Sequence, residues 1–458
     1  MFHTDTIAAI STGMTSSGIG IVRISGQDAV EIADKVYDSR NGKKLADMPT
    51  HTIHYGYIRD GEEFLDEVLV MIMRAPRSFT AEDTVEINCH GGVYAMNRIL
   101  ELVIRMGARP AEPGEFTKRA FLNGRIDLSQ AEAVIDVINA RNEYALKSSV
   151  SQLKGSVLKA IREIREKILY HIAYIESALD DPEHISLDGY ADQLESHTEQ
   201  WKEKIESLIA SSENGKRMKE GIRTVIVGKP NAGKSSLLNV LLGEERAIVT
   251  DIAGTTRDVL EEQMSLSGIS LNIIDTAGIR NTEDVVEKIG VKKAKTYAKD
   301  EDLIIYVVDS STSLDENDEE IMELIRDRKA IVLLNKVDLD PVTTEETIRA
   351  RLDKPVIPVS AKEEQGIDRL EQTVKDMFYD GKISFNDEIF ITNMRQKAAL
   401  SEALESLKQV IVSIQNQMPE DFYSIDLMNA YEELGSITGE SVGEDLVNEI
   451  FSKFCMGK

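Results

Sequence analysis

The chain has 458 residues, a length that allows two to four domains. Its hydrophobic fraction of 42% and charged fraction of 29% are typical of soluble globular proteins. The formal net charge of −27 argues against a general nucleic-acid binder, because neutralising phosphates requires clustered cations. Two short basic runs, at 216–219 and 292–295, are candidates for a local basic patch, although such runs are more often solvated faces of helices.

The sequence also indicates where the protein works. No apolar run reaches the ~18 residues that a membrane span needs, and the first residues lack the basic and apolar segments of a secretory signal. Cys89 and Cys455 are the only 2 cysteines, which is typical of a reducing compartment and leaves no disulfide framework. We therefore expect a soluble, cytoplasmic protein.

Residues 1–120 mix strand and helix patterns and predict a small α/β domain. Alternation over 19–24 favours a strand, and the runs 51–58 and 68–73 on either side of an Asp-Gly turn favour a hairpin. The segment 94–106 favours an amphipathic helix. The glycines at the start of this region lack the spacing of a dinucleotide-binding loop, so the region has no nicotinamide or flavin signature of its own.

From Ser129 onward the patterns become helical. Ser129 and Glu132 have the spacing of a capping box. Apolar residues then recur at steps of three and four from Val150 to Leu179, which predicts one long bundle helix that ends before Pro182. A further helix is expected over 194–209, with its tryptophan in the core.

Residues 228–236 have the strand, glycine-rich loop and helix order that a phosphate-binding loop requires. Glycines allow successive backbone N–H groups to face one concavity, and the helix N-terminus adds the positive end of its dipole. Lys234 can then reach the outer phosphates, and the Ser235 hydroxyl can bind Mg²⁺. The alternative, a glycine-rich turn in an ordinary α/β unit, is disfavoured by the spacing and by both flanking elements.

A second string follows a buried strand predicted at 271–274. It contains Asp275, whose carboxylate can hold the Mg²⁺ shell, and Gly278, whose N–H can meet a γ-phosphate.

Two more strings follow predicted strands and identify the base. In the run 335–338, the carboxylate of Asp338 can accept hydrogen bonds from the N1–H and the 2-amino group of guanine. Adenine offers no such donor pair, so ATP would leave this carboxylate unpaired at a cost of roughly 1–3 kcal/mol. The run 360–362 suits the loop that closes over the base. Together, the strings resemble the GTPase signature set and predict a GTP site.

Helical patterns resume after the nucleotide domain, at 397–414, 427–437 and 446–454. Neither helical flank is expected to form a folded domain by itself. We therefore expect a P-loop, Ras-like GTPase domain (213–380) inserted into a discontinuous all-α domain (121–212 plus 381–458), with an α/β domain (1–120) before it. Two domains in tandem are the alternative.

The chain as a whole resembles the bacterial tRNA-modification GTPases of the MnmE (TrmE) family. The resemblance rests on the GTPase strings and on segments at both ends of the chain. These segments are GIVRISG at 20–26, FTAED at 79–83, HGG at 90–92, PGEFTKRAF at 113–121, DIAGTTRD at 251–258 and FCMGK at 454–458.

The resemblance implies a homodimer that pairs through its N-terminal domain and works with a flavin partner, MnmG (GidA). The pair would install an aminomethyl or carboxymethylaminomethyl group at carbon 5 of the tRNA wobble uridine. The one-carbon unit would come from a bound tetrahydrofolate derivative, in its 5-formyl or methylene form. The GTP hydrolase would require Mg²⁺ and K⁺.

The GTP site can be specified residue by residue. The residues expected to bind GTP are Asn231, Ala232, Gly233, Lys234, Ser235, Ser236, Thr250, Asp251, Ile252, Ala253, Gly254, Thr255, Thr256, Asp275, Thr276, Ala277, Gly278, Asn335, Lys336, Asp338, Ser360, Ala361 and Lys362.

The resemblance also assigns the metals. Ser235 and Thr256 would bind Mg²⁺, while Asn231, Thr250, Ile252 and Thr255 would form the K⁺ cage. A monovalent cation there would neutralise charge that develops between the β- and γ-phosphates. Read without the resemblance, Asn231 is a plain turn residue.

The residue after Gly278 is Ile279, where Ras-like enzymes carry a glutamine that positions water. Isoleucine can neither orient nor deprotonate water, so the role must fall elsewhere. The resemblance places it on Glu287, which would be the catalytic residue; read alone, Glu287 is one acid in an acidic stretch.

The resemblance places a folate site on Arg23, Glu86, Arg125 and Lys458. A carboxylate such as Glu86 can accept the ring N–H and 2-amino pair of a pterin, and the glutamate tail of folate needs cations. The alternative for Arg23 and Glu86 is a surface ion pair that contributes well under ~1 kcal/mol.

Two other classes of function compete with the modifying enzyme. The chain could be a ribosome-assembly or signalling switch in which the nucleotide gates RNA binding, but the flanks show no recognisable RNA-binding module. A folate-binding scaffold with a vestigial GTPase is disfavoured by the intact nucleotide strings.

Overall fold

The computed structural model describes residues 5–241, 243, 261–266, 269–274, 301–379, 391–454 and 457. The chain forms two compact units, each described here by itself. The first comprises residues 1–135, 152–195 and 405–458, and the second comprises 136–151 and 196–404. Four helices continue from one unit into the other: α4 (Leu128–Asn139), α5 (Glu143–Leu153), α7 (Tyr190–Glu220) and α14 (Met394–Gln415).

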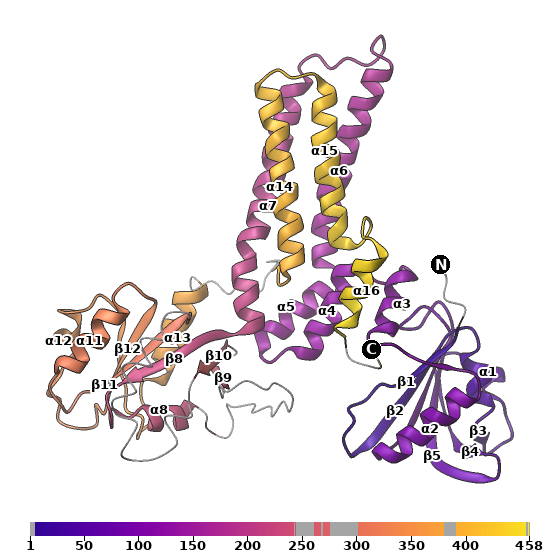
Figure 1. Ribbon diagram of the computed structural model, residues 1–458, viewed down its shortest axis with the longest axis horizontal. Coiled ribbons are helices and arrows are strands. Elements are labelled where there is room, and N and C mark those ends of the chain that lie inside the picture. The colour runs from indigo at the N-terminus through magenta and orange to yellow at the C-terminus, as the bar shows by residue number, and fades with distance from the viewer. Residues whose placement is uncertain are drawn as a thin grey trace. The chain divides into compact units, whose positions relative to one another are not determined.

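The first unit contains a seven-stranded sheet in the order β3-β4-β5-β6-β2-β1-β7 (Figure 1). Neighbouring strands are antiparallel, except that β1 and β7 are parallel. The strands are β1 (Ile7–Ile10), β2 (Ser17–Ser25), β3 (Tyr37–Ser39), β4 (Thr52–Asp60), β5 (Glu63–Met73), β6 (Thr84–Gly91) and β7 (Arg109–Pro110). The predicted strand at 19–24 and the predicted hairpin are confirmed as β2 and as the β4–β5 pair.

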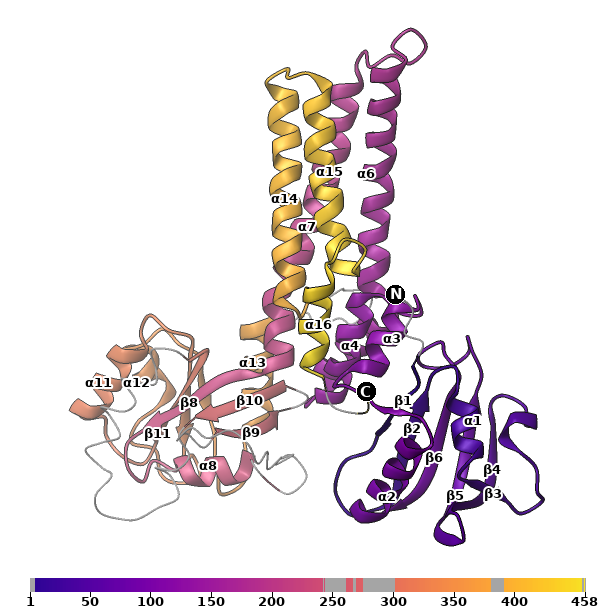
Figure 2. The same ribbon diagram turned by 45° about the vertical axis from the view of Figure 1, so that its right-hand side comes forward.

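Helices cover one face of this sheet (Figure 2). They are α1 (Ala29–Asp34), the short 3₁₀ helix η1 (Leu45–Asp47) and α2 (Val93–Arg105), which confirms the helix predicted at 94–106. Strand side chains such as Ile24, Val70 and Ile87 are fully buried beneath them. On the opposite face Ile53, Tyr55 and Leu69 of β4 and β5 are exposed, whereas Phe116 packs against Ile7 and Ala9 of β1, so this face has a hydrophobic cover at β1 but none over β4 and β5 within this unit.

The helical part of the first unit joins distant parts of the chain. Helices α6 (Ser156–Asp180) and α15 (Glu420–Thr438) lie side by side (Figures 1 and 2), and Arg165 of α6 pairs with Glu440 just beyond α15. Helix α16 (Glu444–Ser452) packs against α3 (Glu115–Leu122) through an apolar cluster that includes Ala120 and Phe451. The segments predicted at the C-terminal end are thus helical, as expected.

The predicted long helix from Val150 to Leu179 is wrong in one respect. Gly155, with φ of 87°, separates α5 from α6, and this left-handed backbone cannot continue a helix. The apolar stripe itself is correct over α6, where Val157, Ile168 and Ile175 are buried. The helix ends at Asp180, before Pro182, as predicted.

The predicted capping box is also wrong by two residues. Asp127, not Ser129, is the residue that caps α4: its Oδ1 accepts hydrogen bonds from the N–H groups of Ser129 and Gln130, at 2.7 and 3.2 Å. The Gln130 side chain accepts the Asp127 N–H in return, at 3.1 Å. This is the same reciprocal pattern with aspartate as the capping residue.

The second unit contains a six-stranded sheet in the order β13-β12-β11-β8-β10-β9, parallel except at the β9–β10 pair. The strands are β8 (Ile222–Gly228), β9 (Glu261–Leu266), β10 (Ile269–Ile274), β11 (Leu303–Asp309), β12 (Ala330–Asn335) and β13 (Val356–Pro358). Each strand predicted for the nucleotide domain is present.

Helices cover both faces of this sheet, which is why its strands are apolar runs. Helices α8 (Lys234–Leu241) and α13 (Ile367–Tyr379) share one core with the sheet, while α11 (Glu316–Ile325) and α12 (Glu345–Arg349) share the other. This doubly wound architecture, together with the mixed sheet of the first unit and the long helices, confirms the predicted fold class.

Helix α7 includes the helix predicted at 194–209, and Trp201 is buried in it as expected. The basic run at 216–219 ends the same helix: Met218 is buried and Lys219 pairs with Asp136 at 2.7 Å, so the run is not a free cationic patch. The run at 292–295 lies outside the described residues.

None of the described helices is long and apolar enough to cross a bilayer.

Candidate functional site

The phosphate-binding loop connects β8 to α8 at the carboxyl end of the parallel sheet, where ligands of such sheets bind. Three residues of the loop have left-handed backbone: Gly228 (φ 154°), Asn231 (φ 58°) and Gly233 (φ 97°). A Cβ at 228 would lie 2.4 Å from the Val307 carbonyl oxygen, so this position admits only glycine. Asparagine tolerates the left-handed region, which explains its place in the tight turn.

Lys234 begins α8, and main-chain oxygens hold its ammonium. Its Nζ donates to the carbonyl oxygens of Gly228 and Lys229, at 2.8 and 2.6 Å. Burial lowers the pKa of Lys234. Ser235 and Ser236 lie in the first turn of α8, at the positive end of the helix dipole. This arrangement suits a bound anion.

Asn335 joins the phosphate loop to the loops predicted to hold the base. Its side chain is buried, with only 1% of the residue exposed. Its Nδ2 donates to the Ala232 carbonyl at 2.9 Å, and its Oδ1 accepts the Ala361 N–H at 3.1 Å. One amide group therefore connects three chain segments, each of which was predicted separately to bind GTP.

We call the two hydrogen bonds of the Asn335 side chain, to Ala232 and Ala361, the Asn335 joint. The Asp338 carboxylate, three residues further along the chain, is exposed. Ser360 Oγ donates to Asp338 Oδ1 at 2.7 Å, and this hydrogen bond lowers the pKa of Asp338, with Lys362 and Lys336 adding a smaller electrostatic contribution. An ionised carboxylate only accepts hydrogen bonds, which is the chemistry that the two donors of guanine require. The structure thus brings the predicted base-binding residues together.

Lys336 lies in the same loop as Asp338 and contacts the end of β11. Its φ is 63°, and its Nζ lies 2.5 Å from Asp309 Oδ2 at the end of β11. Ser310 follows Asp309 in the chain, and its hydroxyl donates to the Lys336 carbonyl at 2.9 Å. Asp309 and Ser310 were not predicted as site residues, and their only sequence signal is their position at the carboxyl end of an apolar strand.

Part of the predicted nucleotide site lies outside the described residues. These residues are Thr250, Asp251, Ile252, Ala253, Gly254, Thr255, Thr256, Asp275, Thr276, Ala277, Gly278 and Glu287.

The residues predicted to bind folate lie in the first unit, where Arg23 of β2 and Glu86 of β6 are cross-strand partners. Arg23 Nε donates to Glu86 Oε1 at 2.8 Å, and their side chains are only 16% and 11% exposed. The pair is therefore largely buried, unlike an exposed ion pair at the surface. The Arg23 guanidinium lies 5.7 Å from the ring centre of Phe79 and 5.5 Å from that of Phe116.

Two more groups converge on this pair. Arg125 stands 5.0 Å from the ring centre of the same Phe79. The carbonyl of Gly457 accepts hydrogen bonds from Ser11 Oγ at 3.0 Å and from Arg23 Nη1 at 3.5 Å. Lys458, the remaining predicted folate residue, lies outside the described residues.

Phe79 and Phe116 were quoted in the family strings, but they were not predicted as site residues. Aromatic residues do not by themselves reveal that they flank a cation. Only the cross-strand register and the packing of α3 bring both rings to Arg23.

Cys89 and His90 follow Glu86 on β6 and carry less functional evidence. Burial raises the pKa of Cys89 to about 11, so its thiol is protonated and unreactive at neutral pH. The His90 ring is exposed and bonds Asp66 at 2.6 Å, which raises the pKa of His90. Among the residues that the structure describes, no cluster of histidine, cysteine and carboxylate side chains could hold a metal ion.

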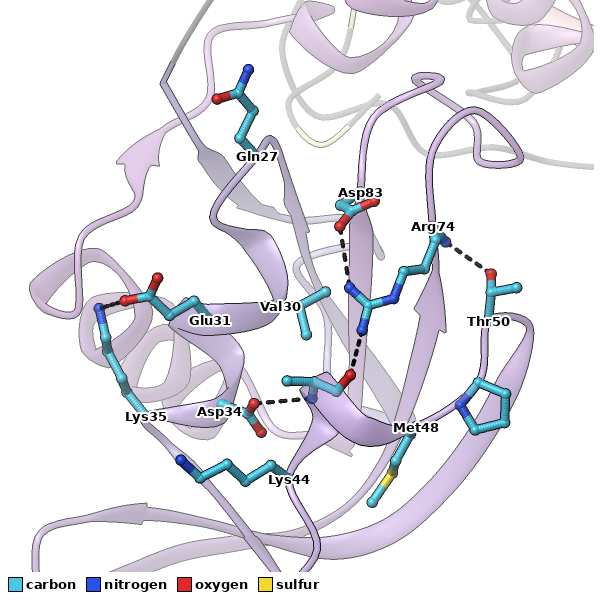
Figure 3. Close-up of a pocket in the computed structure, with 12 residues that line it drawn as sticks. Gln27, Val30, Glu31, Asp34, Lys35, Lys44, Met48, Thr50, Arg74 and Asp83 are labelled. Carbon is cyan, nitrogen blue, oxygen red and sulfur yellow. Dashed lines mark hydrogen bonds and ion pairs between the residues drawn. The ribbon is translucent and has the colours of Figure 1, made fainter.

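A groove of about 970 Å³ opens elsewhere in the first unit, between α1, η1 and the start of the segment after β5 (Figure 3). Four of its charged groups form two pairs, Lys35 with Glu31 at 3.1 Å and Arg74 with Asp83 at 3.3 Å, while Asp34 accepts the N–H groups of Leu45 and Ala46. The groove contains none of the predicted site residues, and we assign no ligand to it.

Comparisons with known proteins agree with these observations. Residues 6–125 match the family described as GTP-binding protein TrmE N-terminus, and residues 128–455 match the MnmE helical domain. The tRNA modification GTPase MnmE of Lachnoclostridium phytofermentans is 62% identical over 99% of this chain and 100% of its own length. That of Clostridioides difficile is 49% identical over the full length of both.

Among solved structures, a single-residue variant of Aquifex aeolicus Era bound to GDP and AlF₄⁻ matches 40% of this chain and 66% of its own, at 27% identity and a TM-score of 0.27. The family matches and the full-length relatives identify the chain as a member of the tRNA modification GTPase MnmE family.

Proposed function

We propose that this GTP hydrolase acts, together with the flavoprotein MnmG, on the wobble uridine of tRNA, and that it adds an aminomethyl or carboxymethylaminomethyl group at carbon 5. The observation that carries the GTPase half of the proposal is the Asn335 joint, which ties the phosphate loop to the Asp338 and Ser360 corner. The modification half is supported by the relatives that align with the whole chain, because these relatives are named tRNA modification GTPases.

The nucleotide residues have distinct roles in this proposal. Lys234 stabilises the outer phosphates, Ser235 and Thr256 bind Mg²⁺, and Asp338 selects guanine. Asn231, Thr250, Ile252 and Thr255 bind K⁺; the left-handed turn at Asn231 and the exposure of this residue support its part in the cage. K⁺ supplies positive charge between the phosphates, and Glu287 orients the attacking water.

The folate part of the proposal rests on the Arg23 site. Glu86 offers a carboxylate to a pterin ring, while Arg23 and Arg125 offer cations to the glutamate tail, and Lys458 adds a further cation. The low exposure of Arg23 and Glu86 supports a binding role, because desolvated charged groups discriminate between ligands more strongly than exposed ones. The rings of Phe79 and Phe116 supply apolar walls.

We further propose a homodimer that uses the part of the N-terminal sheet left uncovered over β4 and β5. Tyr55 and Leu69 are direct cross-strand neighbours on this face, and Ile53 and Phe64 extend the apolar surface, with exposures between 39% and 61%. Contiguous apolar surface of this kind marks protein interaction sites. The domain bounds 1–120, 121–212 plus 381–458, and 213–380 are part of the same proposal.

The function is tested by deleting the gene and measuring wobble uridines by mass spectrometry. We expect the modified nucleoside to disappear and to return when the intact gene is restored. Unchanged modification levels would refute the tRNA half and favour a nucleotide-gated switch.

The hydrolysis mechanism needs its own test. We expect single-turnover hydrolysis to be much faster in K⁺ than in Na⁺, and Glu287→Ala to abolish it while GTP affinity stays within a few-fold. Equal rates in the two salts would remove K⁺ from the proposal, and a Glu287→Ala variant that still hydrolyses GTP would remove Glu287.

A further inference from the structure

The side chain of Lys229, the first residue of the phosphate loop after β8, points to α11 and its capping residue. Its Nζ lies 2.7 Å from Asp318 Oδ2 and 3.0 Å from Asp315 Oδ2. Burial opposes the charge of Lys229, but the hydrogen bonds to Asp318 and Asp315 outweigh it and raise the pKa of Lys229. The side chain of Lys229 thus ties the loop to α11 and its capping residue through two carboxylates.

Asp318 is buried, and several hydrogen bonds fix its carboxylate. Only 1% of the residue is exposed, and its Oδ1 accepts the hydroxyl of Tyr306 at 2.7 Å. Its Oδ2 also accepts the Asp315 N–H at 2.9 Å, as part of the capping box that starts α11. Tyr306 is fully buried in β11, the strand beside β8. The carboxylate that receives Lys229 is therefore held by the sheet and by the helix.

The backbone of Lys229 explains why the contact of its side chain with Asp318 matters for the nucleotide. The Lys229 carbonyl accepts Lys234 Nζ at 2.6 Å, and the neighbouring Gly228 carbonyl accepts it at 2.8 Å. An ammonium has three donors, so these two bonds leave one direction for a ligand. The position of the Lys229 carbonyl thus helps to aim Lys234.

We propose that Lys229, Asp318 and Tyr306 form a positioning anchor for the phosphate loop. The anchor fixes the Lys229 carbonyl, and this carbonyl orients the Lys234 ammonium toward the phosphates before GTP arrives. None of the three residues belongs to the predicted site, and Lys229 itself does not contact the ligand in this arrangement, because its ammonium is occupied by two carboxylates. The inference requires GTP binding only, and it does not depend on potassium, folate or tRNA.

The test compares the affinities of the full-length chain for GTP and ITP. ITP keeps the triphosphate but lacks the 2-amino group, so the ratio of the two affinities reports base recognition at Asp338 and not the phosphate loop. We expect Lys229→Met to lower the affinities for GTP and ITP about tenfold each and to leave their ratio unchanged. Lys229→Arg, which keeps the charge, should restore most of the affinity.

Lys229→Met leaves Asp318 as a buried charge, which can destabilise the fold. The double variant Lys229→Met/Asp318→Asn removes both charges and carries the test if the single variant unfolds. Glu319→Gln is the matched control: this residue neighbours Asp318 on α11, is exposed, and pairs with Arg351 at 3.3 Å. It should bind GTP as the unaltered chain does.

Two results would overturn the anchor. One is a folded double variant that binds GTP within twofold of the unaltered chain. The other is a loss of affinity in which the GTP-to-ITP ratio also falls, because the damage would then extend to the base site.

Discussion

Gly233 occupies a position that admits no side chain. Its φ is 97°, and a Cβ built there would lie 2.0 Å from Asn335 Nδ2. The obstacle is the amide that joins the phosphate loop to the base loops, and it cannot move without breaking its bond to Ala232. The absence of a side chain at 233 is therefore a condition for the Asn335 joint.

We accordingly predict that Gly233→Ala lowers GTP affinity at least a hundredfold, because either the joint breaks or the strained loop rearranges. Gly443→Ala is the control, since a Cβ there meets nothing within 4 Å and its φ of −69° suits any residue. Fluorescent GTP titration measures both variants. A Gly233→Ala variant with unaltered affinity would contradict the geometry of the joint.

Asp338 permits a prediction about base choice. Asparagine at this position would offer one acceptor and one donor, which complements the N1–H and 2-oxo groups of xanthine and opposes the 2-amino group of guanine. We expect Asp338→Asn to reverse the preference from GTP to XTP by roughly a hundredfold. Asp340→Asn, an equal charge change two residues away at another exposed position, should leave the preference unchanged.

The pH dependence of this preference follows from the same carboxylate. The Ser360 hydrogen bond lowers the pKa of Asp338 below its ordinary value of 3.8, so the group contributes its bonds above that range and loses them only as the pH falls through the lowered pKa. The ratio of GTP to ATP affinity should therefore be constant from about pH 8 to about pH 5. A decline within that interval would mean that another group controls base recognition.

At the level of single elements, the carboxylate that caps α4 is buried and only partly hydrogen-bonded. Asp127 caps the helix through Oδ1, and among the described residues no hydrogen-bond donor reaches its buried Oδ2. Burial is the main reason that the pKa of Asp127 is raised. A carboxyl with a raised pKa in the folded state stabilises the fold fully below its unfolded-state pKa, and this contribution is lost as the pH rises through the folded-state value.

We therefore predict that Asp127→Asn, which keeps the capping oxygen without the charge, raises the urea midpoint at about pH 7 and has little effect near pH 3.5. Asp127→Ala should lower the midpoint at both pH values, by about 1 kcal/mol in unfolding free energy, because it removes the cap. A lower midpoint for Asp127→Asn at neutral pH would show that the ionised carboxylate has a partner in solution.

The elements differ in how far the sequence predicts them, and the reason is local. Helix α2 and the β4–β5 hairpin follow from periodicity and a turn pair, which short-range sterics determine. The break at Gly155 escaped prediction because the apolar stripe continues across it, and a glycine can either interrupt a helix or be tolerated within it.

The residues of the candidate sites also fall into those that local sequence predicts and those that it does not. The phosphate loop and Asp338 were predictable, because their chemistry is local to a strand end and a loop. The Asn335 joint, the Lys229 anchor and the aromatic rings around Arg23 were not, because each depends on residues that the fold brings together from separate segments.

At the scale of the whole chain, the first unit is assembled from three separate segments. The last segment pairs with the middle one through Arg165 and Glu440, and again where Ser424 donates to Glu176. Arg165 also lies 4.0 Å from the ring centre of Tyr431. These contacts favour the insertion of the GTPase domain over a tandem arrangement.

We predict that limited proteolysis between 380 and 390 leaves the two fragments associated on a sizing column under native conditions. Apolar burial along α6 and α15, together with the Arg165 contacts, holds them together after the cut. The same digest in urea is the control and should separate them. Clean release of 391–458 from a native digest would favour the tandem arrangement.

The pairing of α6 with α15 has a consequence for synthesis. The end of α6 at 180 and the start of α15 at 420 are 240 residues apart in the chain. At a translation rate of roughly 5–20 residues per second, the isoleucine stripe of α6 emerges from the ribosome about ten to fifty seconds before its partner exists. During that interval the nascent helix offers an uncovered apolar ridge to chaperones, so depletion of a ribosome-bound chaperone should reduce the yield of this chain more than that of its isolated nucleotide domain.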